Sequence, residues 1–69
     1  MTSREATAKV KKYLDEKGIA HGKVSGRMVN FEDLARGAAI FVKVELRDPS
    51  RYYDLKNLAK EHGFFVDIV

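Results

Sequence analysis

Two phenylalanines and three basic residues have the chemistry to bind a nucleic-acid strand if the fold brings them to one face of a sheet. Phe41 and Phe65 lie in segments where apolar and polar residues alternate, and both rings point away from the more apolar side. The cations are Lys23, Arg27 and Lys43. An exposed aromatic ring stacks on any base, and Lys and Arg hold phosphates. These five residues form the predicted site for single-stranded nucleic acid.

The same face fits a second interpretation, in which it contacts a protein. Val29 and Val69 fall on the side of the two phenylalanines, so the four side chains make an apolar patch that a second copy of the chain would cover. Glu45 and Asp67 also fall there, and they disfavour phosphate while offering partners for cations at the rim of an interface. A homodimerising or adaptor module therefore stays open as the alternative.

A further basic set would extend the positive surface around one edge of the sheet. It comprises the cations Arg47, Arg51, Lys56 and Lys60, together with Tyr53. In total, 13 Lys and Arg against 10 Asp and Glu give a net charge of +3, so the chain is basic but not strongly so. The position of the cations thus says more about a nucleic-acid partner than their sum does.

The inventory of reactive side chains predicts a protein without catalysis, metal or cofactor. His21 and His62 are the only histidines, they fall on different predicted elements, and no cysteine is present as a nucleophile or ligand. His21 sits in a glycine-flanked turn without an orienting partner, which makes it a poor general base. His62 is expected on the buried side of a helix, beside its C-terminal cap.

The size of the chain predicts a single domain, residues 1–69, with a small core. A core of this size yields only about 3–5 kcal/mol of stability, and no disulfide can add to it. A content of 45% hydrophobic residues with one proline nevertheless indicates a folded chain. No stretch has the length and apolarity of a signal peptide or a membrane span, so we expect a cytoplasmic protein.

The first helix is predicted over Thr2–Lys17. Thr2 and Glu5 have the spacing of a capping box, and Gly18 is placed to end the helix, with Ile19 folding back onto it. Its expected buried residues are Ala6, Val10, Tyr13 and Leu14.

The second helix is predicted to follow Asp48 and Pro49 and to end near His62. Asp48 is a good N-cap, proline suits the first helical position, and Gly63 suits the end. Its expected buried residues are Tyr52, Leu55, Leu58, Ala59 and His62.

Three strands are predicted, over 21–30, 38–46 and 64–69. The first contains glycines that thin it, and Gly26 marks a possible site for a bulge. Between the first two strands, Phe31–Arg36 is predicted to form one helical turn, with Phe31 and Leu34 closing one end of the core.

The order of elements predicts an α+β fold, α-β-β-α-β, with both helices on one face of a three-stranded sheet. The most apolar strand, 38–46, is expected in the centre with the last strand parallel to it. An arrangement with the first strand in the centre and every pair antiparallel also fits. In either case the uncovered face carries the predicted site.

Overall fold

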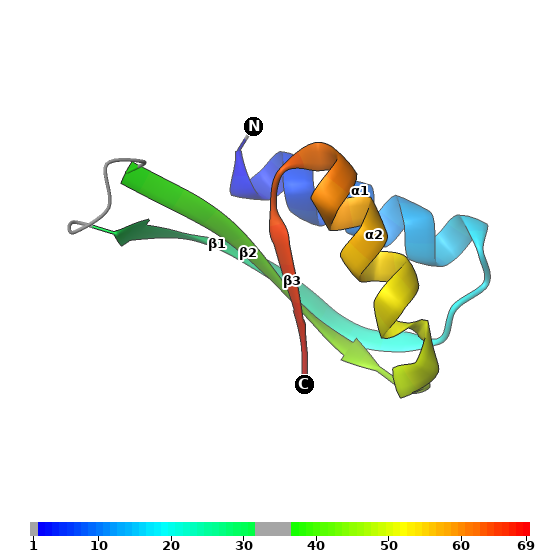
Figure 1. Cartoon of the computed structure of the whole chain (residues 1–69). Helices are drawn as coiled ribbons and strands as arrows, with labels where there is room; N and C mark the ends of the chain where they lie inside the picture. Colours follow the sequence, from blue (N-terminus) through cyan, green and yellow to red (C-terminus); the bar gives the residue numbers. More distant parts are fainter. Residues whose placement is uncertain (1, 32–36) are drawn as a thin grey trace.

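The computed structural model describes residues 2–31 and 37–69 and has the predicted α-β-β-α-β order (Figure 1). Its elements are α1 (Ser3–Glu16), β1 (His21–Phe31), β2 (Gly37–Leu46), the 3-10 turn η1 (Pro49–Arg51), α2 (Tyr52–His62) and β3 (Phe65–Ile68). The predicted helical turn over Phe31–Arg36, with Leu34 in the core, lies outside the described residues except at Phe31, where the backbone is the end of β1 and not the start of a turn.

Local hydrogen bonds define both ends of α1. The backbone N–H of Glu5 donates to Thr2 Oγ1 at 3.1 Å, and the Thr2 N–H donates to Glu5 Oε1 at 3.3 Å, which confirms the capping box. Gly18 has a φ of 64°, and the next N–H, of Ile19, donates to the Leu14 carbonyl at 2.9 Å. Ile19 is buried in the core, so the helix ends in the predicted hydrophobic return.

The second helix begins at the predicted cap but through a tighter turn. Asp48 Oδ1 accepts hydrogen bonds from the Ser50 N–H at 3.0 Å and from Ser50 Oγ at 2.7 Å, and Pro49 starts η1, which leads into α2. At the other end Gly63 has a φ of 81°, and the Phe64 N–H donates to the Ala59 carbonyl at 3.0 Å. This return directs the chain from α2 into β3.

The sheet has β2 in its centre, with β1 antiparallel and β3 parallel to it. This confirms the first of the two predicted arrangements. The bulge was predicted at Gly26, which is wrong: the register shifts between His21 and Val24, where Gly22 and Lys23 oppose Glu45 alone. The Lys23 N–H donates to Glu45 Oε2 at 3.2 Å, and a β-carbon on Gly22 would overlap this carboxylate.

Gly26 serves a different purpose, the close approach of α1 to β1. It stays in regular register opposite Val42. A β-carbon at this position would overlap Thr7 Oγ1 and lie 2.9 Å from the Ser3 carbonyl oxygen. Since Thr7 Oγ1 donates to that same carbonyl at 2.7 Å, the first turn of α1 rests directly on the glycine.

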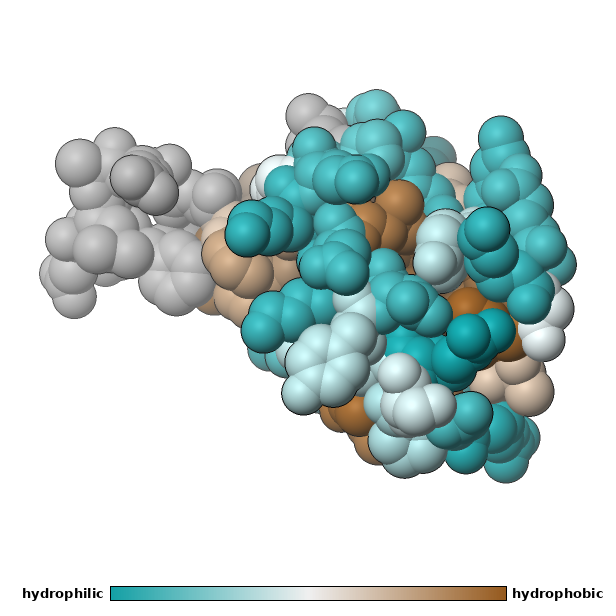
Figure 2. All heavy atoms as spheres, turned by 45° about the vertical axis from the view of Figure 1, so that its right-hand side comes forward, coloured by the Kyte–Doolittle hydropathy of each residue, from teal (hydrophilic) through white to brown (hydrophobic). Residues whose placement is uncertain are grey.

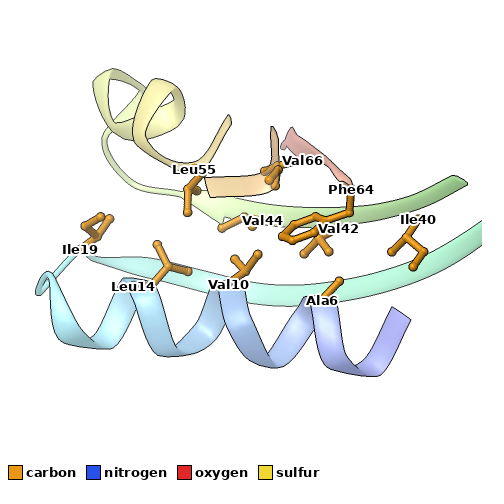
Figure 3. Close-up of a cluster of buried hydrophobic side chains, with 11 residues drawn as sticks. Ala6, Val10, Leu14, Ile19, Ile40, Val42, Val44, Leu55, Phe64 and Val66 are labelled. Atoms are coloured by element: carbon orange, nitrogen blue, oxygen red, sulfur yellow. The ribbon is translucent and has the colours of Figure 1, made fainter. Parts of the chain in front are cut away.

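The core lies between the two helices and the covered face of the sheet. In Figure 3, Val10 and Leu14 from α1 and Leu55 from α2 converge on Val42 and Val44 of β2. These five are the largest fully buried side chains.

The buried stripe of α2 is narrower than predicted. Leu55 and Ala59 are buried, but Leu58 is only partly so and His62 is exposed, contrary to expectation. Phe64, 3% exposed, fills the core at this end of the helix instead, and the His62 ring lies outside it, 6.5 Å from the Phe64 ring. Because the chain turns back at Gly63, Phe64 occupies the buried position that was predicted for His62.

Candidate nucleic-acid interface

The face of the sheet that the two helices leave uncovered, here called the open face, carries the predicted site. One row of side chains on this face crosses all three strands and contains both predicted aromatic residues. Arg27 of β1 is opposite Phe41 of β2, and Phe41 is beside Phe65 of β3. Residues paired in this way point to the same side of a sheet. Arg27 is exposed, Phe65 is 56% exposed and Phe41 is partly buried. The structure thus brings three of the five predicted site residues into contact range.

The two phenylalanine rings stack on each other. Their centroids are 5.1 Å apart and their planes differ by 21°, an offset-stacked geometry that aromatic pairs prefer. Within the described sheet β3 is an edge strand, so the outer side of Phe65 is flanked by no further strand. That side of the ring is where an added planar group can continue the stack.

A second row carries both signs of charge. Lys43 of β2 lies between Ser25 of β1 and Asp67 of β3, and all three are exposed. The Asp67 carboxylate lowers the positive potential next to Lys43. Asp67 therefore opposes phosphate binding on this face, as the Glu45 carboxylate does.

The third part of the site lies at the bulge. Because the Lys23 N–H holds the Glu45 carboxylate, Glu45 is tied to the backbone of β1 at this end of the face. The Lys23 side chain is exposed beside it. The ion pairs of the described part of the chain lie on the helices and at His21, and none of them includes Lys23, Arg27 or Lys43. These three cations are thus available to a ligand.

The residues of the predicted basic edge do not form one surface in the structure, because they have different neighbours. Arg51 Nη1 lies 3.5 Å from Asp54 Oδ2, and the exposed Tyr53 ring packs at a tilt against Tyr52, with centroids 6.0 Å apart. Arg47 is exposed at the end of β2.

Lys56 and Lys60 belong to a different feature, a groove of about 330 Å³ between α2 and β3. Sequence reasoning missed this groove. The four-residue spacing from Tyr52 to Lys56 and Lys60 marks one helix face, but only the placement of β3 shows what that face adjoins.

His21 was predicted to lack an orienting partner, which is wrong, because both of its ring nitrogens have a polar neighbour. His21 Nδ1 donates to the Gly22 carbonyl at 2.8 Å, and Nε2 is 3.8 Å from Asp15 Oδ1 at the end of α1. The contact with Asp15 links the end of α1 to the start of β1. Over residues 2–31 and 37–69, no three His, Cys, Asp or Glu side chains are grouped as metal ligands, and no helix has the length and apolarity of a membrane span.

Comparisons with protein-family models, curated proteins and solved structures found no match to this chain. The geometry of the open face is therefore the basis for assigning a function.

Proposed function

We propose that this protein is a cytoplasmic, non-catalytic module that binds single-stranded nucleic acid on the open face of its sheet. The observation that carries the proposal is the row of Arg27, Phe41 and Phe65, with the two rings stacked at 5.1 Å. A base stacks on the outer side of Phe65 and extends an aromatic pair that already exists. Base–aromatic stacking contributes about 1–3 kcal/mol per base without regard to sequence.

Phosphates are held by the cations on the same face. Arg27 is two strand spacings from Phe65, roughly 10 Å, a distance that a stacked nucleotide and its neighbouring phosphates can bridge. Lys43 lies in the next row and Lys23 beyond it at the bulge. Neutralising three phosphates of a single strand gives a slope of about −2 for the logarithm of the association constant against the logarithm of salt concentration.

A second candidate is self-association through the same face. Phe65 of β3 and Val69, which directly follows that strand, are 56% and 76% exposed, and neighbouring exposed apolar side chains of this kind mark interaction surfaces. Lys43 and Asp67, adjacent on neighbouring strands, supply both charges that a twofold-related copy would need at its rim. This alternative uses the same rings and excludes nucleic acid while the dimer is formed.

The test combines light scattering with fluorescence anisotropy, using a labelled mixed-sequence single-stranded oligonucleotide from low to high salt. The proposal expects a monomer that binds with a salt slope near −2. Replacing Lys23, Arg27 and Lys43 by Gln should bring the slope close to zero. The matched control replaces Lys9, Lys11 and Lys12 of α1, which removes the same charge away from the face. A dimer that is insensitive to salt and does not bind the oligonucleotide would favour the second candidate.

A further inference from the structure

The groove between α2 and the outer edge of β3 is a second potential binding site, which adjoins the open face at Phe65. Helix α2 lies alongside β3 in Figure 1. The walls of the groove are partly aromatic and its rim is basic. Its lining residues include Tyr52, Lys56, Ala59, Lys60, Phe65 and Val66. On the face shown in Figure 2, hydrophilic side chains predominate and hydrophobic residues appear only in separate areas. An apolar groove with two lysines at its rim selects for a ligand that combines apolar and acidic groups.

The backbone of β3 adds hydrogen-bonding groups to this groove. The Val69 N–H donates to the Val44 carbonyl at 3.0 Å, so Val69 and the residues in phase with it bond to β2. Val66 and Ile68 are out of phase and direct their N–H and C=O groups to the outer edge. The Tyr52 hydroxyl donates to the Val66 carbonyl at 3.4 Å, which agrees with that direction. Within the described residues, the outward N–H groups of Val66 and Ile68 have no partner; because Val66 is only 5% exposed, a strand that pairs there must displace the Tyr52 hydroxyl from the Val66 carbonyl.

We propose that this groove binds an extended acidic peptide segment of a partner protein, which adds to β3 as a fourth strand. Strand addition of this kind uses the main chain for affinity and side-chain pockets for specificity. Alternate side chains of the peptide face α2, where apolar groups enter the groove and carboxylates reach Lys56 and Lys60. The inference does not depend on nucleic-acid binding by the open face.

Charge distinguishes this occupant from a second copy of the chain. A twofold antiparallel pairing of β3 with β3 of another copy would set the two α2 helices side by side. Lys56 and Lys60 of one copy would then face the same lysines of the other, and like charges at this position disfavour the pairing. An acidic strand has the opposite charge and meets the same backbone groups.

The probe is a labelled eight-residue peptide with blocked ends in which Val and Glu take turns along one face of the extended strand and Thr occupies the other face, measured by anisotropy and by amide chemical shifts. The proposal expects saturable binding with the largest shifts at Val66 and Ile68. Replacing Glu by Lys in the peptide, or methylating alternate peptide nitrogens on its bonding edge, should abolish binding. The double variant Lys56→Glu, Lys60→Glu should weaken binding at least tenfold. Lys9→Glu, Lys12→Glu on α1 is the control for net charge and should change binding less than twofold.

Other results would overturn the proposal. They are no binding of the probe at millimolar peptide, binding unaffected by N-methylation, an equal loss in the α1 control, or a β3-mediated dimer in light scattering. A groove occupied by nucleic acid would also overturn it, and would appear as loss of oligonucleotide affinity in the Lys56→Glu, Lys60→Glu variant together with no peptide binding. The variant Arg27→Ala separates the two sites, because it should weaken oligonucleotide binding and leave peptide binding unchanged.

Discussion

Phe41 and Phe65 stack at 5.1 Å from neighbouring parallel strands, and the two rings differ in exposure. Phe65 is 56% exposed at the sheet edge, whereas Phe41 lies between β1 and β3 and is partly buried. Substitution of Phe41 therefore disturbs both the stack and its surroundings. Substitution of Phe65 removes the more exposed ring and its stack on Phe41 without opening the centre of the sheet, so it is the better test of the open face.

Phe65→Ala should lower affinity for a single-stranded oligonucleotide by about 5- to 150-fold, the equivalent of 1–3 kcal/mol for one stacked base. The free energy of unfolding should fall by about 0.5–1.5 kcal/mol from the lost aromatic pair, with a further loss from the buried part of the ring. Anisotropy and urea denaturation measure the two quantities. Tyr53→Ala is the control, since Tyr53 is 70% exposed on α2 and away from the open face. Equal losses in both variants would contradict a specific role for Phe65.

Asp67→Asn should raise oligonucleotide affinity. Asp67 is next to Lys43 in the β2–β3 register, so neutralising it removes a repulsion for phosphate and strengthens the field of the lysine. An exposed charge contact of this kind contributes about 0.2–1 kcal/mol, so an increase of up to about fivefold at low salt is expected. Glu61→Gln on α2 controls for net charge. If Asp67→Asn instead weakens a dimer and leaves nucleic-acid affinity unchanged, the self-association candidate gains support.

The predictability of the fold depended on the range of the interactions involved. The alternation in 38–46 was sufficient to assign the covered and open faces, because a period of two sets every side chain of a strand at once. The caps at Thr2 and Asp48 were also predictable, since their partners lie within three residues.

Features that depend on contacts between distant segments were not predictable. A glycine in a strand accommodates either a bulge or the approach of another element, and only the packing of α1 shows that Gly26 does the second while Gly22 does the first. The exposure of His62 and the groove at β3 likewise depend on where the chain returns after Gly63.

Gly26→Ala should destabilise the fold. The new methyl group would overlap Thr7 Oγ1 and crowd the Ser3 carbonyl, and overpacking of this kind typically costs about 1–3 kcal/mol. Urea denaturation measures the loss. Adding Thr7→Ala should recover part of it, since the hydroxyl is removed while the carbonyl contact remains. Ser25→Ala, on the exposed neighbouring position, should be close to neutral. A Gly26→Ala protein as stable as the original would show that α1 does not rest on β1 in this way.

The stability of the cap before α2 should depend on pH in the acid range. Hydrogen bonds from the Ser50 hydroxyl and then from the Ser50 N–H, with a smaller contribution from Arg51, lower the pKa of Asp48. A carboxyl group whose pKa is lower in the folded state stabilises the fold above its unfolded pKa, about 4, and this contribution is lost as the pH falls through the folded value.

The measurement for this prediction is the urea midpoint of the original protein and of Asp48→Asn at pH 7 and pH 3. Asn can still cap the turn but does not titrate, so the advantage of the original protein should be present at pH 7 and smaller at pH 3. Asp67→Asn, which removes an exposed carboxylate from β3, is the matched control for the loss of one negative charge. An advantage of Asp48 that is the same at both pH values would mean that its ionised form does not support the cap.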